Sequence, residues 1–129
     1  MKNGVLFLAH GSRREAGNNE IRNIVHKVRV NDQQHRAFGL AFLEFGQPDV
    51  SEVVANLANL GVVRITAIPL FLAAGKHLWQ DIPNVLKEQQ QKYPHIEFIQ
   101  GKHIGSSDML SELLLDLISQ GEGVKNNEC

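Results

Sequence analysis

The fold of this chain is decided by residues 68–83, which read IPLFLAAGKHLWQDIP. The apolar run at 68–72 is typical of the end of a buried strand, Gly75 predicts a turn, and the residues after it begin a helix. His77 falls at the strand-to-helix turn, and Asp81 shares a helix face with it because it stands four residues further on. An imidazole and a carboxylate at the carboxyl end of a strand can bind a metal ion or transfer a proton.

The rest of the chain repeats this strand-and-helix unit. Apolar runs predict strands at residues 5–9, 37–45, 62–72 and 96–99. Each is followed by apolar residues at helical spacing. In chain order these stripes are Ile21, Ile24, Val25 and Val28; Val50, Val53, Val54, Leu57 and Leu60; Leu78, Ile82, Val85 and Leu86; and Leu110, Leu113, Leu114, Leu117 and Ile118. The order βαβαβαβα predicts an α/β fold, a single three-layer αβα domain with a four-stranded parallel sheet.

Proline and glycine predict where the helices begin and end. Pro48 suits the first turn of the second helix, and Gly61 suits its C-cap. Pro83 is expected in the first turns of the third helix, where its missing N–H costs little. We expect the domain to cover residues 1–120 and residues 121–129, which are polar and carry two glycines, to form a disordered tail.

Composition narrows the classes of function. A chain of 129 residues can bury the core of one domain, and its net charge of −1 does not favour nucleic acid or a membrane surface as a partner. The only cysteine is Cys129, so no intramolecular disulfide forms, which fits a reducing compartment. The apolar run before His10 is too short for a signal peptide, and no run approaches a membrane-spanning length. We therefore expect a cytoplasmic protein.

Three side chains stand where successive predicted strands end. His10 follows the first strand, Glu44 closes the second, and His77 follows the third. Their separations are 34 residues (44 − 10) and 33 residues (77 − 44), about one βα unit each. Because ligands bind beyond the carboxyl ends of parallel strands, we expect these side chains to form a site that binds metal and moves protons.

Taken singly, these residues have ordinary structural explanations. A lone histidine in a βα turn usually caps a helix or is solvated, and Glu44 alone fits a surface charge. Asp81 is favoured in the first turn of a helix by the helix dipole. His103 is a weaker fourth candidate, because residues 101–103 repeat the Gly-Lys-His order of residues 75–77. The coincidence of several such groups at one edge is what favours a site.

Positive charge gathers beside the same edge. Ser12 and Arg13 stand where the first helix should begin, and backbone N–H groups and the helix dipole favour anions there. Arginine adds bidentate recognition of carboxylates, and Lys76 adds a charge next to His77. We expect Ser12, Arg13 and Lys76 to bind an anionic substrate, whereas Arg14 is equally well explained by a solvated turn.

Several segments together resemble the short-form sirohydrochlorin cobaltochelatases of the CbiX type, in the class II chelatase superfamily. They are residues 8–13 (LAHGSR), 42–44 (FLE), 69–72 (PLFL), 75–77 (GKH), 81–83 (DIP) and 112–116 (ELLLD). The resemblance extends from about residue 4 to residue 120 with its spacing preserved. The segment around His103 departs from the family's proline-containing pattern.

The resemblance implies one class II chelatase domain, half of the two-domain form of longer relatives, acting as a homodimer whose two copies form a cleft. It implies a lyase that inserts a divalent metal into sirohydrochlorin for cobalamin or sirohaem biosynthesis. The metal is Co²⁺ first, with Fe²⁺ and Ni²⁺ as alternatives, and it is a substrate, so no permanent cofactor is expected. His10 and His77 match the family's two site histidines, and Glu44 matches an acidic residue that accompanies them.

The chemistry of metal insertion suits these side chains. Pyrrole N–H protons must be removed, and the ion must be partly stripped of water. A neutral imidazole accepts protons near neutral pH, and imidazole with carboxylate binds Co²⁺, Fe²⁺ and Ni²⁺ alike. His10 and His77 are therefore candidates for base and for metal ligand, without a choice between them, and Glu44 assists the ion or the proton.

Other interpretations place the same residues in different classes of protein. A metal-binding or metallochaperone domain would use His10, His77 and Glu44 without turnover. A phosphohistidine phosphatase places Arg-His-Gly after its first strand, but here Ala9 stands in place of that arginine. A flavodoxin-like nucleotide binder is disfavoured because the first turn has neither Gly-x-Gly-x-x-Gly nor the P-loop lysine pattern.

Overall fold

Strands and helices alternate along the chain. The computed structural model describes residues 2–73 and 75–128, with the backbone alone described at residues 77 and 124–128. The elements are β1 (Lys2–Gly11), α1 (Glu15–Asn31), β2 (Ala37–Phe45), α2 (Val50–Asn59), β3 (Val62–Pro69), α3 (Lys76–Lys92), β4 (Glu97–Gln100), the 3₁₀ turn η1 (Ile104–Ser106) and α4 (Met109–Glu128). The predicted βαβαβαβα order is confirmed.

The strands form one parallel sheet with the order β2-β1-β3-β4. β1 lies between β2 and β3, and Leu8 is in register with Ala41 on one side and Pro69 on the other. An unbroken apolar run suits this central position, where Leu6 and Leu8 are fully buried. The predicted α/β fold with a four-stranded parallel sheet is therefore confirmed.

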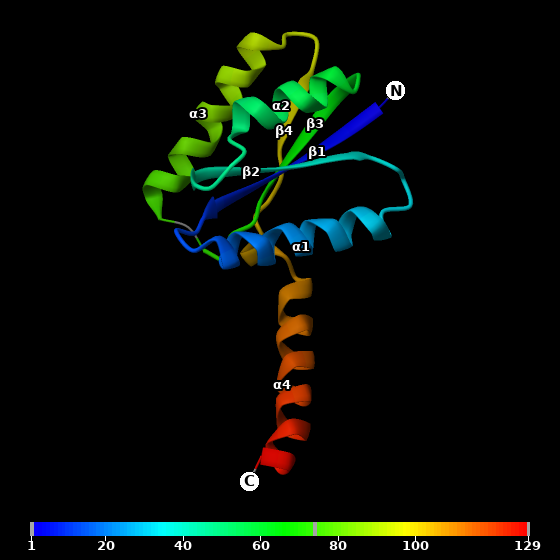
Figure 1. Ribbon diagram of the computed structural model, residues 1–129, viewed down its shortest axis with the longest axis vertical. Coiled ribbons are helices and arrows are strands. Elements are labelled where there is room, and N and C mark those ends of the chain that lie inside the picture. Colours follow the sequence, from blue (N-terminus) through cyan, green and yellow to red (C-terminus); the bar gives the residue numbers. More distant parts are fainter. Residues whose placement is uncertain (1, 74, 129) are drawn as a thin grey trace.

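Helices lie on both faces of the sheet. Figure 1 shows α2 and α3 on one side of the strands and α1 on the other, which gives the three predicted layers. The main core fills the space between the sheet and the pair α2 and α3. It includes Leu6, Leu8, Ile65 and Ala67 from the strands and Val53, Val54, Leu57, Ile82 and Leu86 from the helices.

Two boundaries of the second helix and third strand differ from expectation. Pro48 precedes α2 instead of standing in its first turn. The reason is that Asp49 is the N-cap, and its side chain accepts a hydrogen bond from the Glu52 backbone N–H at 2.9 Å. β3 ends at Pro69 rather than at residue 72, and the chain continues as the loop that leads to α3.

Two other positions refine the expected helix ends. Pro83 lies inside α3, seven residues after the helix begins at Lys76 and so about two turns from its start. Gly61 follows the C-cap residue Leu60, and its φ of +83° is the left-handed conformation that glycine adopts readily at this position.

The last helix projects away from the rest of the molecule (Figure 1). α4 contacts mainly η1, and residues 111–123 are exposed. The predicted apolar stripe is present, but Leu113, Leu114 and Leu117 are each 51% exposed rather than packed on the sheet. The helical backbone continues to Glu128, and the division into a domain at 1–120 and a tail at 121–129 stays a prediction. Within the described ranges, no helix has both the length and the apolar character that crossing a membrane requires.

Candidate active site

The first two strands bring an imidazole and a carboxylate together at the carboxyl edge of the sheet. His10 is the last residue but one of β1, and Glu44 is the last but one of β2. The His10 Nε2 atom lies 2.7 Å from Glu44 Oε2. Their side chains are 44% and 59% exposed, so a ligand can reach both. The predicted meeting of His10 and Glu44 is thus seen directly.

A glycine makes this approach of the two strands possible. Gly11 has a φ of +99°, and a Cβ added there would lie 2.0 Å from the carbonyl oxygen of Phe45. The register of β1 and β2 also shifts between Ala9 and Gly11. A side chain at Gly11 would push the strand ends apart, and with them His10 and Glu44.

A buried asparagine holds the loops on either side of this pair. Asn18, in α1, is 1% exposed. Its Oδ1 accepts from the Ser12 N–H at 2.8 Å, and its Nδ2 donates to the carbonyls of Ser12 and Phe45 at 3.0 and 3.2 Å. The Asn18 side chain therefore ties the loop after β1 to the end of β2.

Sequence reasoning did not identify Asn18, although a signal was present. Asn18 stands three residues before Ile21 and seven before Val25, on the side of the helix that faces inward. A buried amide must find hydrogen-bond partners, and near a strand end those partners are loop backbone groups. An inward-facing asparagine near a strand end therefore predicts hydrogen bonds that link the helix to the neighbouring loops.

Arg22 makes a second tie between α1 and the loop after β2. Its guanidinium donates to Glu15 Oε1, to Asn19 Oδ1 at 2.7 Å and to the Gln47 carbonyl at 3.1 Å. The hydrogen bond from Arg22 lowers the pKa of the Glu15 carboxyl below its ordinary value. The guanidinium also stacks on Phe42, with 5.2 Å between its carbon and the ring centroid.

Aromatic contacts place a cation next to His10. The His10 ring meets Phe45 edge-on, with 5.5 Å between the ring centroids, and the Arg13 guanidinium carbon lies 4.8 Å from the Phe45 centroid. Ser12 Oγ accepts from the Arg14 backbone N–H at 3.1 Å and keeps its own hydrogen to donate. Arg13 and His10 therefore contact the same aromatic ring, and the role of Arg13 and Ser12 in binding an anionic substrate stays a prediction.

Lys76 and His77, the predicted site residues that follow the third strand, lie at the start of α3. Gly75 is the N-cap and Lys76 the first helical residue, so His77 stands inside the helix rather than in the turn before it. The Lys76 side chain is exposed. The side chain of His77 lies outside the described part of the structure, so its relation to His10 stays a prediction. Asp81 is exposed one turn further along α3.

The loop after β4 packs on the same end of the molecule. The rings of His103 and Trp79 meet edge-on with centroids 4.7 Å apart. The Gly105 N–H donates to the Phe71 carbonyl at 3.2 Å. His103, the weaker fourth candidate, therefore contacts the start of α3 through the ring of Trp79.

The described side chains offer a small set of ligands for a metal. Among the side chains that the structure describes, which do not include that of residue 77, no group of three or more His, Cys, Asp or Glu residues is arranged to hold an ion. The pair of His10 and Glu44 supplies one nitrogen and one oxygen donor. A set of two protein ligands leaves most coordination positions open, which suits transfer of an ion rather than permanent storage.

Residues 4–121 match the family model described as CbiX. The sirohydrochlorin cobaltochelatase of Priestia megaterium is 32% identical over 110 residues, which cover 85% of this chain and 35% of the relative. The sirohydrochlorin cobaltochelatase of Methanosarcina acetivorans is 29% identical over 129 residues, which cover 92% of this chain and 96% of the relative. The chain thus spans about a third of the Priestia protein's length and nearly all of the Methanosarcina protein's length.

Solved structures share this architecture. A CbiX protein from Marinobacter aquaeolei has a TM-score of 0.83 at 23% identity, over 94% of this chain and 98% of that one. The sirohydrochlorin chelatase SirB from Bacillus subtilis, in complex with cobalt, has a TM-score of 0.83 at 23% identity, over 93% of this chain and 51% of that one. These two likenesses concern the fold, and the family model covers nearly the whole sequence. The chain belongs to the CbiX family.

Proposed function

We propose that this protein is a sirohydrochlorin chelatase, a lyase that inserts a divalent metal into the tetrapyrrole for cobalamin or sirohaem biosynthesis. The metal is Co²⁺ first, with Fe²⁺ and Ni²⁺ as alternatives, and it is a substrate, so no permanent cofactor is needed. The observation that carries the proposal is the 2.7 Å contact of His10 Nε2 with Glu44 Oε2 on an exposed sheet edge. Membership of the CbiX family and relatives named as sirohydrochlorin chelatases support it.

The pair of His10 and Glu44 suits both parts of the reaction. With the proton on Nε2, the imidazole donates to the carboxylate, and its free Nδ1 can accept a pyrrole proton. With the proton on Nδ1, Nε2 and Oε2 both present lone pairs to a cation. Ligands about 2.1 Å from one ion lie about 3 Å from each other, so a small opening of the 2.7 Å contact would admit a divalent ion.

His77 completes the proposed set. Its backbone stands in the first turn of α3, which follows β3, the strand next to β1. We assign the second imidazole to this residue, as base or as metal ligand. One imidazole can then hold the ion while the other takes the proton, so neither has to do both at once.

Three side chains are assigned to the carboxylates of the tetrapyrrole. Arg13 is exposed and fixed over Phe45, so its guanidinium is presented with little loss of freedom on binding. Ser12 offers a hydroxyl hydrogen, and Lys76 offers an exposed ammonium at the first residue of α3. Each stands close in sequence to one of the proposed catalytic histidines, His10 or His77.

A homodimer and a cytoplasmic location belong to the same proposal. One domain offers a single wall to a large macrocycle, whereas two copies with their carboxyl edges facing would enclose it. The single cysteine, Cys129, leaves no intramolecular disulfide to form, which suits a reducing compartment.

The test is anaerobic mixing of purified protein with sirohydrochlorin and Co²⁺, followed by the visible spectrum against an enzyme-free control and repeated with Fe²⁺ and Ni²⁺. We expect insertion faster than the spontaneous rate, and the metal with the largest acceleration identifies the preferred substrate. No acceleration with any of the metals, together with tight retention of Co²⁺ by the protein, would instead establish a metal-binding or metallochaperone domain.

A further inference from the structure

One aromatic ring joins the two parts of the proposed site. The His10 imidazole meets the ring of Phe45 edge-on, with 5.5 Å between the ring centroids and 79° between the ring planes. The Arg13 guanidinium carbon lies 4.8 Å from the centroid of the same ring. Phe45 has no side-chain group that binds a metal or an anion, yet it contacts one residue proposed for metal and proton chemistry and one proposed for substrate carboxylates.

The backbone of Phe45 is held from two sides. Phe45 is the last residue of β2, and it stands in register with Gly11 of β1. The two backbones approach so closely that a Cβ at Gly11 would lie 2.0 Å from the Phe45 carbonyl oxygen. The same oxygen accepts a hydrogen bond from the buried Asn18 Nδ2 at 3.2 Å. The half-buried ring of Phe45 therefore projects from a backbone that is fixed to both β1 and α1.

The edge-on contact restrains the plane of the His10 ring. The 2.7 Å contact with Glu44 Oε2 fixes the position of Nε2, but the imidazole could still turn about that atom. Terminal rotations of this kind are broad in an exposed side chain, and His10 is 44% exposed. An aromatic ring packed against the imidazole favours one orientation of its plane. That orientation decides where the nitrogen lone pairs point, and so which metal ion or proton they can reach.

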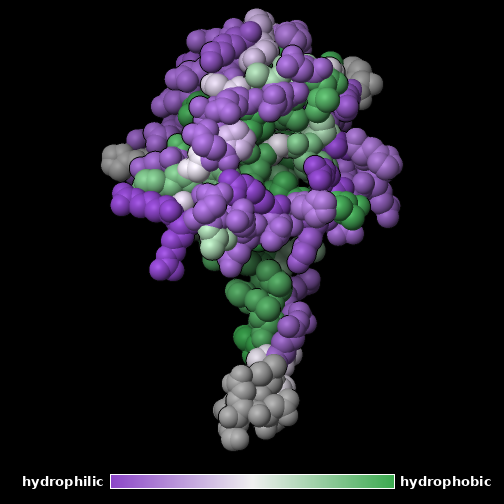
Figure 2. All heavy atoms as spheres, in the orientation of Figure 1, coloured by the Kyte–Doolittle hydropathy of each residue, from purple (hydrophilic) through white to green (hydrophobic). Residues whose placement is uncertain are grey.

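The same ring restrains the Arg13 guanidinium. A guanidinium is planar and carries its N–H donors in that plane, so a ring on one of its faces leaves the donors free to bind both oxygens of a carboxylate. Figure 2 shows hydrophilic side chains that project at the left of the view, where Figure 1 places the loop after β1, with paler green atoms beside them. An anionic substrate can therefore approach the donors of Arg13 from solvent.

We infer that Phe45 is a positioning residue that sets the spacing between the carboxylate-binding Arg13 and the metal-inserting His10. A tetrapyrrole held through a carboxylate at Arg13 presents its ring nitrogens at a distance that the macrocycle determines. An imidazole fixed relative to Arg13 then meets those nitrogens without a further search for geometry. The inference rests on the proposed chelatase function, and it assigns to Phe45 the coupling of substrate binding to metal insertion.

Substitutions that keep or remove the aromatic face test this role. Phe45→Leu keeps an apolar side chain but removes the ring, and Phe45→Tyr restores the ring. Phe38→Leu is the matched control, because Phe38 is also half-buried, lies at the other end of β2 and stacks on Phe7 with 6.1 Å between the centroids. Circular dichroism and urea unfolding establish that each variant is folded at the assay temperature.

Two quantities are measured on each protein. Visible titration gives the dissociation constant of metal-free sirohydrochlorin, and we expect Phe45→Leu to raise it about fivefold. The rate of Co²⁺ insertion at saturating tetrapyrrole should fall about tenfold in the same variant. Phe45→Tyr should recover both values, and Phe38→Leu should change neither. Equal losses for Phe45→Leu and Phe45→Tyr, or for Phe45→Leu and Phe38→Leu, would overturn the inference, as would wild-type values for Phe45→Leu.

A double-mutant cycle separates the two contacts of the ring. In an Arg13→Ala background, Phe45→Leu should no longer change the dissociation constant of sirohydrochlorin, because the guanidinium that the ring holds is absent. It should still slow insertion, because the contact of Phe45 with His10 is lost in both backgrounds. Additive effects of the two substitutions on the dissociation constant would mean that Phe45 and Arg13 act independently, which contradicts the inference.

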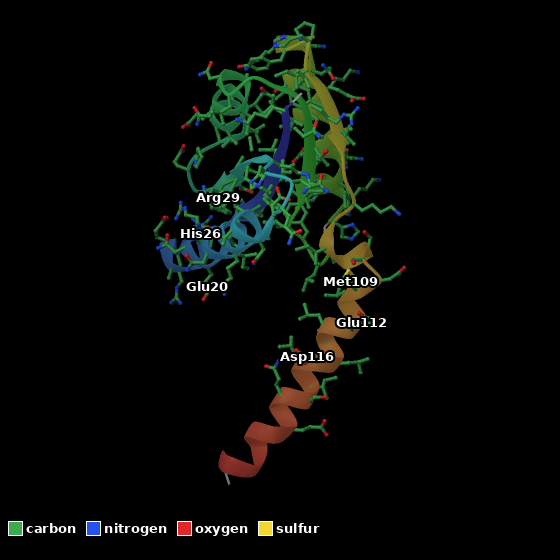
Figure 3. The ribbon with its side chains drawn as sticks, turned by 90° about the vertical axis from the view of Figure 1, so that its right-hand side faces the viewer. Glu20, His26, Arg29, Met109, Glu112 and Asp116 are labelled. Carbon is green, nitrogen blue, oxygen red and sulfur yellow. The ribbon has the colours of Figure 1, made fainter. Side chains whose placement is uncertain are left out.

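Nuclear magnetic resonance tests the contact without metal or tetrapyrrole. The order parameter of the Arg13 Nε–H group should lie above about 0.6 in the wild type and below it in Phe45→Leu. Arg29 on α1 is the control, because its Nη2 lies 3.0 Å from His26 Nδ1 rather than on a phenyl ring, and its order parameter should be the same in both proteins (Figure 3). The ring current of Phe45 should also shift the His10 ring protons, and Phe45→Leu should remove that shift.

These spectra keep the inference separate from the proposed activity. An Arg13 order parameter that is equal in wild type and Phe45→Leu would overturn the role of Phe45 even if the protein inserts metal. A wild-type protein that inserts no metal would refute the chelatase proposal, and the coupling of binding to insertion with it, even if Phe45 orders Arg13 and His10.

Discussion

The two faces of the sheet are filled to different degrees by the same strands. Toward α2 and α3, Leu6 and Ile65 are fully buried. Toward α1, Ile68 is half-buried and Ile99 is 37% exposed. The strands are common to both faces, so the difference comes from the helices: in the part of the chain that the structure describes, two cover one face and α1 alone covers the other. The α2 and α3 face therefore contributes more buried apolar packing, and the α1 face relies more on polar ties such as the hydrogen bonds of Asn18.

The largest predicted difference compares two isoleucines of β3. Ile65→Ala opens a cavity in the fully covered face and should lower the free energy of unfolding by about 4 kcal/mol. Ile68→Ala, on the open face, should lower it by about 1 kcal/mol in dilute protein, because its side chain is already partly hydrated. Urea denaturation measures both. Equal losses of unfolding free energy for the two variants would contradict the difference between the two faces.

The next largest loss of unfolding free energy is expected when the hydrogen bonds of Asn18, near the start of α1, are removed. Asn18→Ala leaves the Ser12 N–H and two carbonyls without their partners and should cost about 3 kcal/mol. Asn19→Ala is the control, since Asn19 is exposed and accepts only from Arg22 among the bonds described, and it should cost less than about 0.5 kcal/mol. If both variants unfold at the same urea concentration, the hydrogen bonds of Asn18 do not stabilise the packing of α1 on the sheet.

On the covered face, the N-cap of α2 should contribute about 1 kcal/mol. Asp49→Ala removes the acceptor of the 2.9 Å bond from the Glu52 N–H and should lower the unfolding free energy by that amount. Asp49→Asn keeps a side-chain acceptor and should differ from the wild type by a few tenths of a kcal/mol. Thermal or urea unfolding of the three proteins measures the cap, and a larger loss for the asparagine variant would show that its charge matters more than its hydrogen bond.

The smallest change in unfolding free energy is expected for a substitution of Asp32, at the C-terminal end of α1, and this change depends on pH. The backbone N–H of Arg36 is the main cause that lowers the pKa of the Asp32 carboxyl, and the Gln34 N–H and the Arg36 guanidinium add to it. A lowered folded-state pKa means that the stabilisation is present above the ordinary aspartate value of about 3.9 and is lost as pH falls through the folded-state value.

Asp32→Asn should therefore be less stable than the wild type at pH 7, and the difference should shrink as the pH falls below about 4. Unfolding curves of the two proteins across this range measure it. A difference that stays constant with pH would assign the effect to packing rather than to the charge of Asp32.

Most of the fold could be predicted because the period of the apolar residues changes cleanly between strand and helix. The run around Leu6 and Leu8 predicts a strand covered on both faces, and the structure buries both residues completely. Boundaries were less predictable where two signals competed. Pro48 suits a first helical turn by itself, but Asp49 supplies a side-chain cap and moves the start of α2 beyond it.

The meeting of His10 and Glu44 could be predicted from spacing and parallel topology. Asn18 was missed because its role depends on loop backbone groups that come together only when the strands are paired. The direction of α4 could not be predicted either, since the apolar stripe that includes Leu114 and Leu117 favours packing on the sheet, whereas the structure leaves both residues 51% exposed.

The most direct test of the account is the rate of Co²⁺ insertion into sirohydrochlorin by variants of two histidines. His10→Ala removes the imidazole that contacts Glu44 and should lower the rate by about 10²–10⁴-fold with little change in stability, because the side chain is 44% exposed. His26→Ala removes an exposed imidazole on α1 that contacts Arg29 and should leave the rate unchanged. Equal rates for wild type, His10→Ala and His26→Ala would contradict a metal-insertion site at the carboxyl edge of β1 and β2.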